Sequence, residues 1–241
     1  MAEDEGKPEL GNTKTDYAVM AGRAVSGLLP FAGSFITELI ESIVPNQRFD
    51  RLVAYVKLLD ERIEGFTFEQ KAAISKSPEA IDLFEEGGSQ AARALSQERL
   101  SYIASLVSFG LKGDENDRIE AKRILALLRS IDDDQVIILA SNLDRYWRDA
   151  AFREKHKELL HVASIHMRSS RDEMDKATVK ELALSALVGL GVLRPRFNSV
   201  RKGDLPEFDS NTGMVKANGH DITSLGRLVL RRLGLAEEGD L

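Results

Sequence analysis

No cysteine occurs among the 241 residues, which excludes disulfides, thiolate nucleophiles and cysteine-ligated zinc or iron–sulfur centres. The sequence also lacks a Walker-type phosphate loop, a dinucleotide-binding glycine fingerprint, an HExxH zinc motif and a GxSxG nucleophile motif. The sequence therefore offers no recognisable catalytic motif for conventional enzyme chemistry. We expect a non-enzymatic protein, and we assign it no catalytic residue, no cofactor and no metal.

Positive charge is also in short supply. Residues 1–130 hold 16 Lys and Arg against 21 Asp and Glu, a net charge of −5, and residues 131–241 hold 17 against 18, a net charge of −1. Nucleic-acid-binding proteins usually carry a basic excess, because phosphate contacts supply much of their affinity. Nucleic acid is therefore an alternative partner, and no small-molecule substrate is predicted.

The chain has no long apolar run. Its most apolar segment, Ala18 to Val44, is uncharged only from Ala24 to Thr37, which is 14 residues, whereas a membrane-spanning helix needs about 20. Pro30 divides the segment into two expected helices. We favour a buried hub or an oligomer interface and keep a membrane-associated effector, acting through residues 18–44, as an alternative. The apolar residues of this candidate partner or oligomer surface are Leu28, Leu29, Phe31, Phe35, Ile36, Leu39 and Ile40.

The chain begins with an acidic, polar stretch, where a secretory signal would be basic and then apolar. We interpret residues 1–13 as a disordered lead and expect a cytoplasmic protein. The rest is predicted to be mainly α, with an all-α helical bundle over 14–130, a winged-helix-like domain with a small two-stranded wing over 131–236, and a tail over 237–241.

Helical periodicity predicts the elements of the bundle. An amphipathic helix is expected from Gln47 to Glu64 and another from Phe68 to Lys76. Ser77 should cap a helix that starts at Pro78. The pattern pauses at 85–89, where two glycines suggest a hinge, and then resumes with Leu95 as its first core residue. A last helix is expected over 118–130.

The second domain shows a different pattern. One helix should hold both the apolar run Val136 to Ala140 and the pair Tyr146 and Trp147. A histidine-bearing helix follows over 152–167. Asp172 or Asp175 should then cap a helix over 176–191, whose predicted core residues are Val179, Leu182, Ala183, Ala186, Leu187 and Leu190.

A small sheet is expected after that helix. Its strands are predicted at 192–200 and 214–217, with a turn at Asn218 and Gly219. The chain then ends in ITSLGRLVLRRLGL, a helix capped by Thr223 and closed by Gly234. This order of elements resembles a winged helix-turn-helix domain. The resemblance implies that the third helix and the wing could meet DNA, although such domains also bind protein alone.

A second resemblance covers most of the chain. The segments QRFDRLVAYVKLL, ERLSYIASLVSFGL and AKRILALLRSI, followed by the terminal "IT-x-LG" helix, are together similar to the bacterial abortive-infection alpha family. That resemblance implies a role in phage immunity. The activity of the family is undefined, so no catalytic residue is carried over.

Histidines and clustered acids are the remaining candidates for chemistry. His156, His161 and His166 are five residues apart, which spreads them around a helix, whereas helical metal ligands favour spacings of three or four. His220, which lies beside Asp221 and follows the Asn218–Gly219 pair, is predicted to be a turn residue. The clusters at Glu85, Asp114 and Asp132 are expected to be solvated helix caps, with Asp133 and Asp134 serving the next helix start.

The predicted recognition helix, 176–191, offers few side chains that could read bases. Basic residues follow it instead, and they could grip phosphates without reading sequence. These candidate phosphate contacts are Arg194, Arg196, Arg201, Lys202, Arg227, Arg231 and Arg232. The leading hypothesis is a module that binds a protein partner or itself, with a nucleic-acid-binding regulator as the first alternative.

Overall fold

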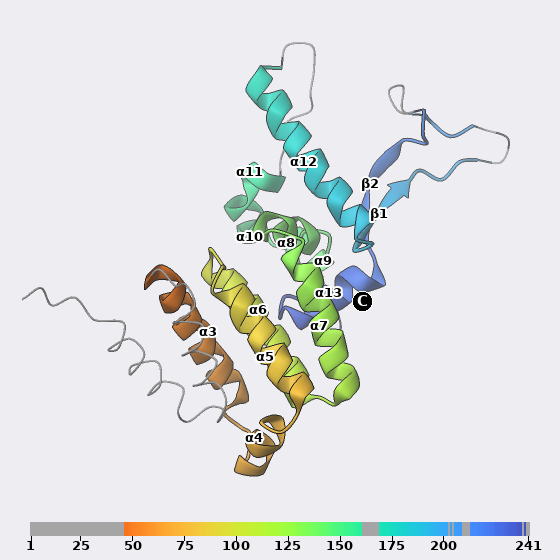
Figure 1. Cartoon of the computed structure of the whole chain (residues 1–241). Helices are drawn as coiled ribbons and strands as arrows, with labels where there is room; N and C mark the ends of the chain where they lie inside the picture. Colours follow the sequence, from red (N-terminus) through yellow and green to blue (C-terminus); the bar gives the residue numbers. More distant parts are fainter. Residues whose placement is uncertain are drawn as a thin grey trace, which may run out of the picture. The chain divides into compact units, whose positions relative to one another are not determined.

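The computed structural model describes residues 46–160, 169–201, 203, 205–208, 213–237 and 239. Its described part is mainly helical, with a small two-stranded antiparallel sheet near the C-terminus (Figure 1). The contacts divide the chain into two compact units, 1–121 and 122–241. The division falls within one helix, ahead of the boundary after residue 130 that the sequence suggested. The segment 18–44, with its candidate partner surface, lies outside the described residues.

The first unit is built on three neighbouring helices. They are α3 (Asn46–Ile63), α5 (Pro78–Ala91) and α6 (Gln97–Lys112), and α3 packs against both of the others (Figure 1). The short α4 (Phe68–Ile74) joins α3 to α5, and α7 (Glu115–Arg129) follows α6. The amphipathic stripe predicted for α3 is Phe49, Leu52, Val53, Val56, Leu59 and Ile63. Val53 is half-buried and the Phe49 side chain lies outside the described part, whereas Leu52, Val56, Leu59 and Ile63 are buried. Burying each such side chain contributes about 1.5–3 kcal/mol.

Helix α5 is the main departure from prediction in this unit. Ser77 caps it and Pro78 occupies its first turn, as expected, but the helix runs through 85–89 without a pause. The reason is close packing, since a Cβ on Gly87 would lie 2.5 Å from Val107 Cγ2 and 2.7 Å from the Tyr55 hydroxyl. The break comes after Ala91 instead. Leu95 lies in that break and is 87% exposed, so its assignment to the core was wrong.

The second unit starts within α7 and continues with four short helices. They are α8 (Asp133–Ala140), α9 (Asp144–Arg148), α10 (Ala150–Lys155) and α11 (Lys157–Leu160). The single helix predicted over 136–147 is wrong. Ser141 Oγ and Asn142 Nδ2 donate hydrogen bonds to Ile138 O at 2.7 and 2.8 Å, and such bonds compete with helix continuation. The helix predicted over 152–167 is also wrong in its described part, because it is interrupted at His156, the C-cap of α10. Residues 161–167 lie outside the described part.

The long helix α12 (Arg171–Gly189) begins earlier than predicted. Ser170, rather than Asp172 or Asp175, is its N-cap, and Glu173 completes a capping box. Its C-terminal end packs on α8 and β1. Of its predicted core residues only Leu187 is buried, whereas Val179 and Leu182 are 66% and 69% exposed. The predicted core face of α12 is therefore wrong at Val179 and Leu182, whereas Ala183, Ala186 and Leu190 are half-buried.

Strands β1 (Leu193–Phe197) and β2 (Ala217–Ile222) pair antiparallel, with Leu193 opposite Ile222. The predicted turn at Asn218 is wrong, because it lies inside β2 and Gly219 pairs with Arg196. The connection between the strands is therefore long, and Phe208 bridges to Val215 within it. Helix α13 (Ser224–Arg232) has the predicted Thr223 cap and ends before Gly234. In Figure 1, α12 and this hairpin extend from a shared base in different directions.

Candidate functional site

The candidate phosphate contacts on the sheet are partly neutralised. Arg194 Nε lies 3.8 Å and Arg196 Nη1 3.4 Å from the carboxylate of Asp221, in the neighbouring strand. Two guanidinium groups thus share one carboxylate, which leaves one positive charge in excess. Arg201 is exposed beyond the strand, and Lys202 lies outside the described residues.

The candidate phosphate contacts on α13 are not presented to solvent as a group. Arg227, Arg231 and Arg232 are each half-buried. Arg227 Nη1 donates to Ile222 O at 3.4 Å, and the Nε atoms of Arg227 and Arg231 are both buried without a hydrogen-bond partner. These guanidinium groups pack within their own unit, so the seven residues do not form one exposed basic face.

The described histidines lie in dissimilar places. His156, at the end of α10, stacks against Phe152 with ring centroids 4.8 Å apart. His220 is a strand residue opposite Pro195, so its assignment to a turn was wrong. Burial lowers the pKa of His220, and Arg196 lowers it further while Asp221 opposes both. His161 and His166 lie outside the described residues. Among the residues that the structure does describe, no group of His, Asp and Glu could hold a metal ion.

Sequence reasoning missed an exposed apolar surface on the second unit. This surface contains nine of the fourteen large apolar side chains that are exposed in the described part of the chain. Three lie on α12, and six lie on the hairpin formed by β1, β2 and the described parts of their connection, which we call the arm. The nine residues of this arm–α12 surface are Met174, Val179, Leu182, Phe197, Val200, Leu205, Phe208, Met214 and Val215.

The exposure of these side chains is large. Leu205 is 86%, Met214 71% and Phe208 54% exposed on the arm. Single exposed apolar residues are ordinary, but a concentration on two adjoining elements is typical of a binding surface. On α12 the helical periodicity did signal an apolar stripe, yet periodicity alone cannot tell a buried stripe from one kept free for a partner.

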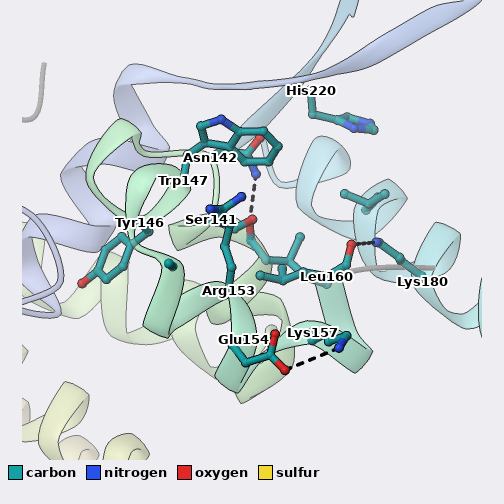
Figure 2. A pocket seen from close by; sticks show the side chains of 13 residues that line it. Ser141, Asn142, Tyr146, Trp147, Arg153, Glu154, Lys157, Leu160, Lys180 and His220 are labelled. Atoms are coloured by element: carbon teal, nitrogen blue, oxygen red, sulfur yellow. Dashed lines mark hydrogen bonds and ion pairs between the residues drawn. The ribbon is translucent and has the colours of Figure 1, made fainter. Parts of the chain in front are cut away.

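A cavity of about 540 Å³ lies within the second unit (Figure 2). Helices α8 to α12 supply its walls, and β2 supplies His220. Apolar surface comes from Ile138, Leu160 and Leu184, and aromatic surface from Tyr146 and Trp147. The Tyr146 hydroxyl points away from the cavity in Figure 2, since it donates to Leu235 O at 2.9 Å. Trp147 is 65% exposed at the cavity and is the only tryptophan in the sequence.

The charged side chains of this cavity are mostly basic. Arg153, Lys157 and Lys180 line it together with one acid, Glu154. Glu154 forms an ion pair with Lys157 at 3.4 Å, along the lower edge of Figure 2. Two positive charges therefore remain in excess at the cavity, although the whole chain has a net charge of −6.

Lys180 reaches the cavity from α12. Its Nζ donates a hydrogen bond to Leu160 O at 2.5 Å, and burial lowers its pKa. The Arg153 side chain extends from α10 toward the indole of Trp147 (Figure 2). The lining residues come from five helices and from β2, and Lys180, Leu184 and His220 are distant in sequence from the others. Local spacing in the sequence therefore could not reveal the whole site.

No family model, no curated protein and no solved structure matches this chain. Among the described residues, no helix is both long enough and apolar enough to cross a membrane. Interpretation of the site therefore depends on its own geometry.

Proposed function

We propose that this protein is a non-enzymatic interaction module, and that its arm–α12 surface binds a second copy of the chain. The observation that supports this function is the exposure of the nine large apolar side chains of that surface. Transferring such side chains from water to an interface is favourable by about 25 cal/mol per Å² of apolar area.

A second copy fits this surface because the two parts of it are complementary. Both α12 and the arm expose large apolar side chains, so a two-fold axis could place the arm of each copy against α12 of the other. Their net charges are also opposite in sign, because α12 carries four acids against three basic residues, and Arg201 adds to the one positive charge that Arg194 and Arg196 retain beside Asp221. Asp175 and Glu181 are exposed acids on α12, whereas the arm carries Arg194, Arg196 and Arg201. Charge pairs around an apolar centre would orient the two copies.

Light scattering after size exclusion tests the proposal on the full chain. The wild type should show twice the chain mass of 26.7 kDa. Leu182→Ser and Phe208→Ser should each weaken the dimer roughly tenfold or more, since each removes an apolar side chain of both copies from the interface. Leu95→Ser is the matched control, because Leu95 is even more exposed, at 87%, but lies in the first unit.

Three outcomes would contradict the proposal. One is a wild-type monomer at every concentration, and another is an equal effect of Leu95→Ser. The third is a dimer that resists Leu182→Ser and Phe208→Ser but dissociates with Phe35→Ser and Leu39→Ser, which would assign the interface to the segment 18–44.

A nucleic-acid-binding winged helix is the second candidate. The observation in its favour is the order of α12, an antiparallel hairpin and α13, with three arginines on the hairpin. Heparin retention that falls steeply with salt would support it. An absence of retention at low salt would contradict it. The bacterial phage-defence context remains a proposal that depends only on the resemblance to the abortive-infection alpha family.

A further inference from the structure

We infer that the cavity between α8 and α12 binds an organic anion, whose planar ring lies against Trp147 and whose anionic group is held by Arg153 and Lys180. The site shares α12 and β2 with the arm–α12 surface, but none of the nine apolar residues of that surface lines the cavity. Its volume of about 540 Å³ lies within the range of small-molecule sites, about 300–1,000 Å³.

The anionic group is inferred from the unbalanced charges. Arg153 makes no ion pair with any residue that the structure describes, whereas Lys157 is already matched by Glu154. Lys180 carries three donors, and its one hydrogen-bond acceptor in the described structure is Leu160 O. A partly buried ammonium without a carboxylate partner is costly. A phosphate or carboxylate in the cavity would offset that cost and accept hydrogen bonds from Arg153 as well.

The planar ring is inferred from the aromatic and apolar walls. Trp147 presents its indole at the cavity, and Ile138, Leu160 and Leu184 supply apolar surface. An inorganic anion would leave this surface uncovered, and a neutral hydrocarbon would leave the cations unmatched. A ring that bears one anionic group satisfies both parts of the wall. Nucleotides and aromatic carboxylates share this chemistry.

The imidazole of His220 can contact such a ligand in its neutral form. The direction of its pKa shift keeps the imidazole uncharged near pH 7. A neutral imidazole can donate one hydrogen bond and accept another. It therefore adds polar recognition without adding to the charge of the cavity.

Calorimetric titration of the full chain tests the inference. The probes are adenosine 5′-monophosphate for a phosphate source and 2-naphthoate for a carboxylate source, with adenosine and inorganic phosphate as partial ligands. At least one full probe should bind saturably and more than about tenfold more tightly than its parts. That probe should also change the fluorescence of the single tryptophan, Trp147.

Variants separate the site from general charge attraction. Arg153→Gln and Lys180→Met should each weaken binding of the full probe by about tenfold or more. Arg148→Gln is the matched control, because Arg148 lies on neighbouring α9, pairs with Asp144 at 3.1 Å and does not line the cavity. It should change affinity less than about twofold.

The inference would be overturned if neither probe bound up to about 1 mM. It would also fail if inorganic phosphate bound as tightly as the nucleotide, or if Arg148→Gln weakened binding as much as Arg153→Gln. Circular dichroism of each variant confirms that the comparison is made between folded proteins.

Discussion

The Tyr55 hydroxyl is fully buried between α3, α5 and α6, and it makes no hydrogen bond within the part of the chain that the structure describes. Its ring packs against Phe84 with centroids 6.2 Å apart, so the side chain contributes through apolar contact. Burying a hydroxyl without a partner costs about 1–3 kcal/mol. At this residue the packing energy of the ring therefore outweighs the cost of its polar atom.

Tyr55→Phe should raise the free energy of unfolding by about 1 kcal/mol at pH 7, because it removes the unpaired hydroxyl and retains the ring. Urea denaturation measures the change. A loss of stability would contradict this account, since it would mean that the hydroxyl has a partner in the folded protein.

The same variant should alter the response to alkali. Burial raises the pKa of Tyr55 above its usual value of 10.0, so the folded state stays protonated where the unfolded state ionises. Stability should therefore be complete below about pH 10 and fall above it by up to about 1.4 kcal/mol per pH unit. Tyr55→Phe should lack this part of the alkaline slope.

At the scale of elements, side-chain caps fix where several helices begin. Thr67, Asp132 and Ser170 each form a capping box, with Gln70, Gln135 and Glu173 respectively. The cap of α8 differs from the sequence prediction, which had assigned the free amides to Asp133 and Asp134. Asp132 Oδ1 accepts from the Gln135 amide at 2.7 Å, and Gln135 Oε1 accepts from the Asp132 amide at 2.9 Å.

Asp132→Ala should lower the free energy of unfolding by about 1 kcal/mol, because it leaves helical amides without an acceptor. Asp134→Ala is the matched control, since Asp134 is an exposed residue in the first turn of α8. It should cost at most a few tenths of a kcal/mol through the helix dipole. Equal losses in urea denaturation would mean that the cap is not the stabilising interaction.

Element existence was largely predictable, whereas element boundaries were not. The Ser77 cap with Pro78, the Thr223 cap of α13 and the four buried residues of the α3 stripe follow from local chemistry, and the structure confirms them. The uninterrupted α5 could not be predicted, because glycine lowers helix propensity locally. Its helix survives because Gly87 lets α5 approach Tyr55 and Val107, which are distant in sequence.

At the scale of the whole molecule, each compact unit encloses its own core. Gly87 belongs to the first unit, and Gly226 to the second. A Cβ on Gly226 would lie 2.3 Å from Val192 O and 2.8 Å from Ile222 Cγ1. Both positions therefore require a residue without a side chain, and substitution at either should disturb the core around it.

Hydrogen exchange can separate the two units. Gly226→Ala should cost about 1–3 kcal/mol and accelerate exchange in α12 and α13, while α3 and α6 keep their protection. Gly87→Ala should accelerate exchange in α3 and α6, while α12 and α13 keep their protection. Gly189→Ala is the control, because nothing lies within 4 Å of an added Cβ there. Faster exchange throughout the chain in both variants would show that the protein unfolds as one cooperative unit.

The sequence by itself determined the mainly helical class, the small C-terminal sheet and the absence of cysteine chemistry. These follow from composition, periodicity and capping, which act over a few residues. Only the tertiary structure decided that Val179 and Leu182 are exposed and that Arg227 is half-buried. It alone brought Trp147, Arg153 and Lys180 to one cavity. The physical reason is that burial and charge balance depend on which distant elements meet. Local sequence patterns do not predict those contacts.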